Sequence, residues 1–136
     1  MLANKGATAM IDISDGLLAD ARHLAFASNV VLELDAARIP CGPDVTTEFA
    51  LRSGEEYELL ATVPAAAVQA LLDGWSACSS TSVTIVGKVV ANDGETLTSD
   101  NALSRVLVRG HAQPGESSNA SSTHVEFNVG HDHFSF

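Results

Sequence analysis

The chain has 136 residues and a formal net charge of −10, from 17 acidic and 7 basic residues. This length is sufficient for one domain with a hydrophobic core that needs no disulfide bonds. The acidic balance argues against a nucleic-acid backbone or an anionic membrane surface as the main partner. An acidic protein that handles phosphates would need metal ions to mediate the contact.

The two cysteines, Cys41 and Cys78, lie far apart in the sequence and have no metal-ligand spacing. They therefore indicate free thiols in a reducing compartment. Residues 1–6 contain neither a long apolar core nor a cleavage pattern, so the sequence predicts no signal peptide and no membrane span. We expect a cytoplasmic protein.

A strand at 7–11 and a helix at 17–25 are the first predicted elements, and an acidic turn connects them. The helix has apolar residues at helical spacing, and the strand is short and apolar. The spacing predicts that Asp12 closes the strand, that Ser14 caps the helix and that Asp15 opens it, next to the positive end of the helix dipole.

Asp12 and Asp15 are candidate ligands of a divalent cation. An acid at the end of an apolar strand needs a partner or water, and a second carboxylate nearby repels it unless a cation lies between them. Carboxylate oxygens together with phosphate oxygens and water are the ligands that Mg²⁺ prefers. The alternative interpretation is that Ser14 and Asp15 only cap the helix.

The remaining elements alternate at first and then become mostly strands. A short helix capped by Asp44 is expected over 44–51, and an Ala-rich helix begins at Pro64 and carries Trp75 on its apolar face. Further strands are predicted at 30–34, 57–63, 83–90, 106–108 and 125–129. A hairpin turn is predicted at 92–94, and 110–123 is expected to be a mobile polar loop.

This order of elements predicts the fold class. We expect one domain over residues 1–136, of α+β (mixed α/β) type, with a mixed β-sheet covered by helices.

A second acidic cluster lies at 53–60, where three carboxylates follow Gly54. Glu55, at a turn supported by that glycine, is placed to accept hydrogen bonds from an amino group or a cationic ring. The alternative interpretation is a solvated turn at the start of a strand.

Three segments, taken in order, resemble the C-terminal half of the thiamine-monophosphate kinase family. They are Asp-Ile-Ser-Asp-Gly-Leu at 12–17, Ser-Gly-Glu-Glu-Tyr-Glu-Leu-Leu at 53–60 and Gly-His-Asp-His-Phe at 130–134. The first segment is also similar to the wider superfamily of aminoimidazole-ribonucleotide synthetase-like ATP enzymes. The resemblance implies the C-terminal domain fold of that superfamily.

The resemblance also implies a reaction and a set of site residues. The reaction is transfer of the ATP γ-phosphoryl group to thiamine monophosphate, with Mg²⁺ held by Asp12 and Asp15. Ser14 would contact ATP, and Glu55 and His131 would contact the thiamine substrate. Positioning and charge neutralisation supply most of the acceleration in such a transfer, so no catalytic nucleophile or base is expected.

The N-terminal domain of the family has no counterpart here, so the resemblance implies a missing partner domain and a possible homodimer. Catalysis by positioning is sensitive to the loss of residues that form one side of the site. We therefore expect the chain to be inactive by itself. Two alternatives stay open: another ATP-dependent enzyme of the superfamily, or a non-catalytic interaction module.

Three histidines near the end of the chain, at 124, 131 and 133, suggest a zinc or nickel site only weakly, because their spacing matches no familiar ligand set. Arg105 and Arg109 are expected to be solvated charges beside strands.

Overall fold

The computed structural model describes residues 6–54, 57–92, 106–109 and 124–129, and for the last of these ranges the backbone alone. The described elements, in chain order, are β1 (Ala9–Ile13), α1 (Leu17–Ser28), β2 (Val30–Asp35), η2 (Ala36–Arg38), α2 (Thr47–Arg52), β3 (Glu58–Pro64), η3 (Ala65–Ala67), α3 (Val68–Ser76), β4 (Val83–Ala91), β5 (Val106–Arg109) and β6 (His124–Val129).

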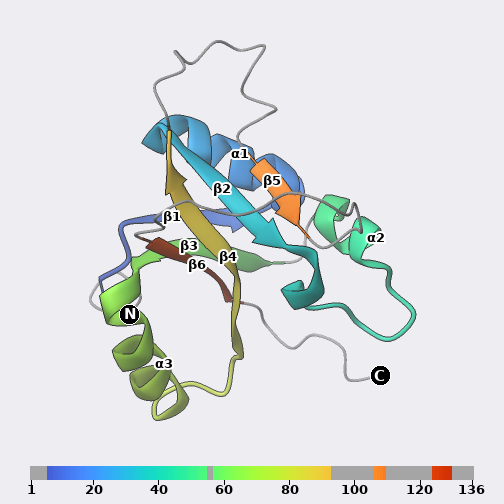
Figure 1. Cartoon of the computed structure of the whole chain (residues 1–136). Helices are drawn as coiled ribbons and strands as arrows, with labels where there is room; N and C mark the ends of the chain where they lie inside the picture. The colour runs from blue at the N-terminus through green and yellow to red at the C-terminus, as the bar shows by residue number, and fades with distance from the viewer. Residues whose placement is uncertain (1–5, 55–56, 93–105, 110–123, 130–136) are drawn as a thin grey trace.

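The six described strands form one mixed sheet in the order β1-β3-β6-β4-β2-β5 (Figure 1). Neighbouring strands are antiparallel except for β2 and β5, which are parallel. This arrangement confirms the predicted mixed sheet of an α+β fold. The prediction of a mobile loop at 110–123 concerns residues outside the described part of the chain.

The helices cover both faces of the sheet. Side chains alternate between the faces along a strand, and on β3 Leu60 belongs to one apolar cluster while the next residue, Ala61, belongs to another. The first cluster includes Leu17 and Leu24 of α1, and the second includes Leu71 of α3. Helices α1 and α3 therefore pack on opposite faces.

Helix α1 ends at Ser28. Asn29 adopts a left-handed conformation, with φ of 54°, and its backbone N–H donates to the carbonyls of Ala25 and Phe26. Asparagine tolerates this conformation at a helix C-terminus, and its amide satisfies carbonyl groups that the last turn leaves without partners. The chain can then turn directly into β2, which begins one residue later.

Trp75 is part of the core, as its place on the apolar face of α3 predicted. Its ring packs against the second apolar cluster, and its indole Nε1 donates a hydrogen bond of 2.8 Å to the carbonyl oxygen of Thr81. A half-buried indole with its one donor satisfied is a stable arrangement. Trp75 thereby ties the end of α3 to the loop before β4.

One local prediction was wrong. Thr46 caps α2, with its side chain accepting from the backbone N–H of Phe49 at 3.2 Å, whereas Asp44 lies outside the helix with φ of 64°. The hairpin turn predicted at 92–94 lies mostly outside the described residues. In the described sheet β4 lies between β6 and β2, and β5 pairs with β2.

Glu33 on β2 is a buried acid that connects three strands. Its side chain is 6% exposed, and it pairs with Lys88 of β4 at 3.2 Å and with Arg109 of β5 at 3.0 Å. Burial raises the pKa of this carboxyl, but the hydrogen bonds and positive charges of Arg109 and Lys88 outweigh burial and hold the pKa below its ordinary value of 4.5. Arg109, expected to be a solvated charge, therefore has a structural role.

Candidate functional site

The acidic turn occupies residues 14–16, between β1 and α1. Gly16 is the N-cap of α1, with φ of 106°, and no side chain caps the helix. The prediction that Ser14 caps the helix and that Asp15 opens it was therefore wrong. Both residues precede the helix, and a different acid binds their backbone N–H groups.

That acid is Asp20, in the first turn of α1. Its Oδ2 atom accepts hydrogen bonds from the backbone N–H groups of Ser14, at 2.9 Å, and Asp15, at 3.0 Å. The side chain is 3% exposed. Sequence reasoning missed this residue, although an acid in the first turn, after a glycine that cannot cap with a side chain, is a recognisable signal.

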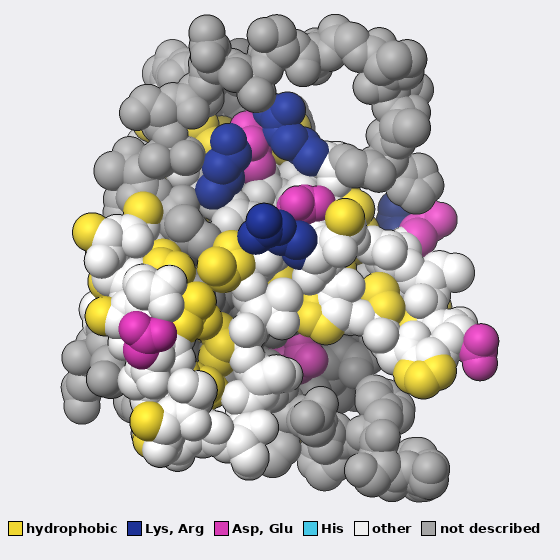
Figure 2. All heavy atoms as spheres, turned by 60° about the horizontal axis from the view of Figure 1, so that its bottom comes forward, with side chains coloured by type: hydrophobic (Ala, Val, Ile, Leu, Met, Phe, Trp, Pro, Cys, Tyr) yellow, Lys and Arg dark blue, Asp and Glu magenta, His cyan; other side chains and the backbone are white. Residues whose placement is uncertain are grey.

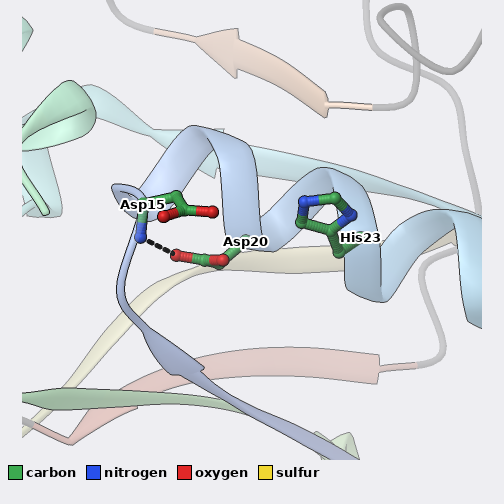
Figure 3. Close-up of side chains that lie close together, drawn as sticks. All are labelled: Asp15, Asp20 and His23. Carbon is green, nitrogen blue, oxygen red and sulfur yellow. Dashed lines mark hydrogen bonds between the residues drawn. The ribbon is translucent and has the colours of Figure 1, made fainter.

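Asp15, Asp20 and His23 each place one potential ligand atom within 4.8 Å of the others. Figure 3 shows the Asp15 and Asp20 carboxylates side by side at the start of the helix, with His23 farther along it. Asp15 and His23 are exposed, whereas Asp20 is buried. The donors at the exposed side of the turn include the hard carboxylate oxygens that suit Mg²⁺, so the residue types fit that ion.

Asp12 is not a member of this cluster. It is exposed on β1, whereas the next residue, Ile13, is buried in the core beneath α1. Because successive side chains of a strand point to opposite faces, Asp12 points away from the face that α1 covers. The sequence paired Asp15 with Asp12; in the structure the acid within ligand distance of Asp15 is Asp20.

Two turns from separate segments are in direct backbone contact at this site. A Cβ atom built on Gly54 would overlap the carbonyl oxygen of Ser14, and one built on Gly16 would lie 2.7 Å from the carbonyl oxygen of Arg52. Only residues without side chains allow such an approach. The two acidic segments that the sequence analysis singled out, 12–17 and 53–60, therefore meet at a pair of glycines.

The sheet register brings the third segment to the same place. Asp12 pairs with Leu59, and Leu59 pairs on its other side with Val129, the last residue of β6. The end of β1, the start of β3 and the end of β6 are thus neighbours. Glu55 and His131 themselves lie outside the described residues.

Tyr57 lies directly before β3, at the end of that strand which adjoins the site. It has φ of 54° and its side chain is 84% exposed. A left-handed conformation is uncommon for an aromatic residue and is found disproportionately at functional sites.

A hollow of about 310 Å³ lies elsewhere, lined by Glu33, Leu34, Asp35, Arg38, Gly87, Lys88 and Arg109. Basic side chains gather beside acidic ones on one face of the molecule (Figure 2). Their charges are largely paired with one another, since Lys88 and Arg109 contact Glu33, and Arg38 contacts Asp35. None of the residues predicted for the site lines this hollow.

The sequence matches the family described as "AIR synthase related protein, C-terminal domain" over residues 1–100. A thiamine-monophosphate kinase from Aquifex aeolicus is 35% identical over 66% of this chain and 30% of its own length. One from Pyrococcus horikoshii is 31% identical over 81% of this chain and 36% of its own length.

Among solved structures, a thiamine-monophosphate kinase from Stenotrophomonas maltophilia superposes with a TM-score of 0.62 and 33% sequence identity, covering 79% of this chain and 33% of that one. These findings confirm the resemblance drawn from the three segments. The chain spans about a third of the length of these relatives. Within its described residues, no helix combines the length and the apolar character needed to cross a membrane.

Proposed function

Because the chain belongs to the family of AIR synthase related proteins, C-terminal domain, we propose that it is the C-terminal domain of a kinase that transfers the ATP γ-phosphoryl group to thiamine monophosphate. The named relatives support this choice of reaction. The observation that carries the proposal is the backbone contact between the turns at Ser14–Gly16 and Arg52–Gly54, which brings the two acidic segments of the resemblance together.

In this proposal Asp12 and Asp15 bind separate magnesium ions, because Asp12 lies outside the cluster around Asp15. Ser14 contacts ATP, while Glu55 and His131 contact thiamine monophosphate. The exposed carboxylate of Asp15, beside a second carboxylate and at the positive end of α1, supports the assignment. Mg²⁺, when bound, neutralises negative charge on the phosphates during transfer.

The protein's own contribution is to position the phosphates. The acceptor is a phosphate that is already ionised, so the chain needs no general base to activate it. The turn is held by Asp20 on one side and by Gly54 on the other, and these contacts place Ser14 and Asp15 before any ligand binds.

The proposal includes a partner domain. The chain spans about a third of its relatives, and we propose that the complete site also needs the N-terminal part of those proteins, so that the isolated chain forms no thiamine diphosphate. A homodimer and a cytoplasmic location belong to the same proposal. The alternative is that the chain belongs to another ATP-dependent enzyme of the same superfamily.

Mg²⁺-dependent nucleotide binding by the isolated chain tests the proposal. At an ATP concentration of 100 times the dissociation constant, Mg²⁺·ATP is expected to raise the free energy of unfolding by about 2.7 kcal/mol. Asp15→Asn removes a charged ligand and is expected to weaken binding at least about tenfold, equivalent to about 1.4 kcal/mol. Calorimetric titration and thermal unfolding measure both effects.

The matched control is Asp73→Asn, because Asp73 is an exposed acid on α3, away from the turn. Its affinity for Mg²⁺·ATP should equal that of the unsubstituted chain. The proposal fails if ATP has no effect with Mg²⁺ present, or if both substitutions weaken binding equally. A titration with thiamine monophosphate distinguishes the kinase from a superfamily member with another substrate.

A further inference from the structure

Asp20 is a buried acid without a cation partner among the ion pairs of the described residues. Its negative charge is stabilised by two backbone N–H groups and by its place in the first turn of α1. Hydrogen bonds to a charged acceptor are about twice as strong as neutral ones. The buried carboxylate of Asp20 therefore restricts the conformation of the backbone whose N–H groups it binds.

We propose that Asp20 is a positioning residue, which holds the Ser14–Asp15 backbone in the conformation that binds Mg²⁺·ATP. The identity of the ligand, Mg²⁺·ATP, rests on the proposed function. The contact between Asp20 and the Ser14 and Asp15 backbone does not depend on it. Two consecutive N–H groups converge on one oxygen atom, Oδ2, so both peptide planes are fixed at once. On the other side, the carbonyl of Ser14 packs against Gly54.

The competing role for Asp20 is that of a direct metal ligand, together with Asp15 and His23. The two roles differ in what Asp20→Asn does. Because both N–H groups use the same oxygen, the amide oxygen of asparagine can accept both hydrogen bonds and keep the turn in place. A metal ligand, in contrast, loses its negative charge in Asp20→Asn and in Asp20→Ala alike.

Residue-resolved amide hydrogen exchange on the 136-residue chain tests the contact without any ligand. Asp20→Ala removes two hydrogen bonds to a charged group, so exchange at the Ser14 and Asp15 amides should accelerate at least about tenfold relative to core amides. Asp20→Asn should accelerate exchange at these amides clearly less than Asp20→Ala does, because two neutral hydrogen bonds remain. Asp73→Ala, a matched substitution on α3, should leave both amides unchanged.

Unchanged exchange at these amides in Asp20→Ala would overturn the inference. If Asp20→Ala does not fold, the NMR spectrum of Asp20→Asn tests the inference instead. Replacing a charged acceptor by a neutral one should move the Ser14 and Asp15 amide protons upfield while core amide resonances keep their positions. Amide protons that do not move would contradict the proposal.

Affinity for Mg²⁺·ATP supplies the second measurement. The positioning role predicts that Asp20→Asn stays within about threefold of the unsubstituted dissociation constant, whereas Asp20→Ala loses about tenfold or more. Equal losses in both variants would show that the charge itself binds the ion, and would overturn the inference. If the unsubstituted chain binds no Mg²⁺·ATP, the proposed function fails, and the exchange data still decide the role of Asp20 in the turn.

Discussion

Gly54→Ala is expected to lower the free energy of unfolding by about 3 kcal/mol, at the upper end of what overpacking a close contact costs. The new Cβ atom would overlap the carbonyl oxygen of Ser14 and approach the backbone of Asp15. The neighbouring atoms belong to the backbone, so no side chain can rotate away. The two turns must then separate. Denaturant unfolding monitored by circular dichroism measures the change.

Gly42→Ala is the matched control. A Cβ atom there would meet only the side chain of Val45, at an ordinary contact distance of 3.6 Å. Its effect on the free energy of unfolding should stay within about 0.5 kcal/mol. Equal stability of Gly54→Ala and Gly42→Ala would contradict the close contact between the turns.

Glu33→Gln is expected to lower the free energy of unfolding at neutral pH by about 2 kcal/mol. Removing one partner of a buried ion pair can cost about 3–5 kcal/mol, but Lys88 and Arg109 are 33% and 50% exposed and recover part of their hydration. The loss should loosen β5, a four-residue edge strand, most of all. Amide exchange at Leu107 and Val108 should therefore accelerate more than exchange in β3.

The effect of Glu33→Gln should depend on pH in a defined direction. The pKa of Glu33 is lowered in the folded chain, so its charge stabilises the fold fully above the ordinary pKa of 4.5. This stabilisation is lost as the pH falls through the lowered pKa, because the carboxyl then takes up a proton in both states. The difference in the free energy of unfolding between Glu33→Gln and the unsubstituted chain should shrink towards zero in that acidic range.

Glu48→Gln is the control for this pH profile. Glu48 is 81% exposed, and its contact with Arg52 is 4.0 Å long, so the substitution should change stability little at any pH. A Glu33→Gln variant as stable as Glu48→Gln at neutral pH would show that the three-strand contact contributes nothing.

Patterns within one segment predicted most of the fold. The apolar periodicity of 17–25 and the β-branched run at 83–90 correctly predicted α1 and β4, because burial of one face dictates such patterns. The strand order could not be read in the same way. The placement of β6 between β3 and β4 depends on contacts across the whole sheet, which no local pattern contains.

The site was predicted in part. The sequence identified both acidic segments, but their contact at Gly16 and Gly54 is a tertiary feature that no local pattern contains. Ser14 has the residue type of a helix cap, and local propensity favours it there. Asp20 instead binds the backbone of the turn, and Gly16 takes the cap position. Long-range packing and one buried acid thus overrode the local preference.

We propose that the acidic turn holds a divalent ion against the phosphates of ATP. Paramagnetic Mn²⁺, added with ATP in place of Mg²⁺, broadens the amide resonances nearest to the bound ion. We expect broadening centred on residues 12–16 and on Gly54, which packs against them. Broadening centred instead on the Glu33 and Asp35 hollow, or absent from the turn, would contradict it.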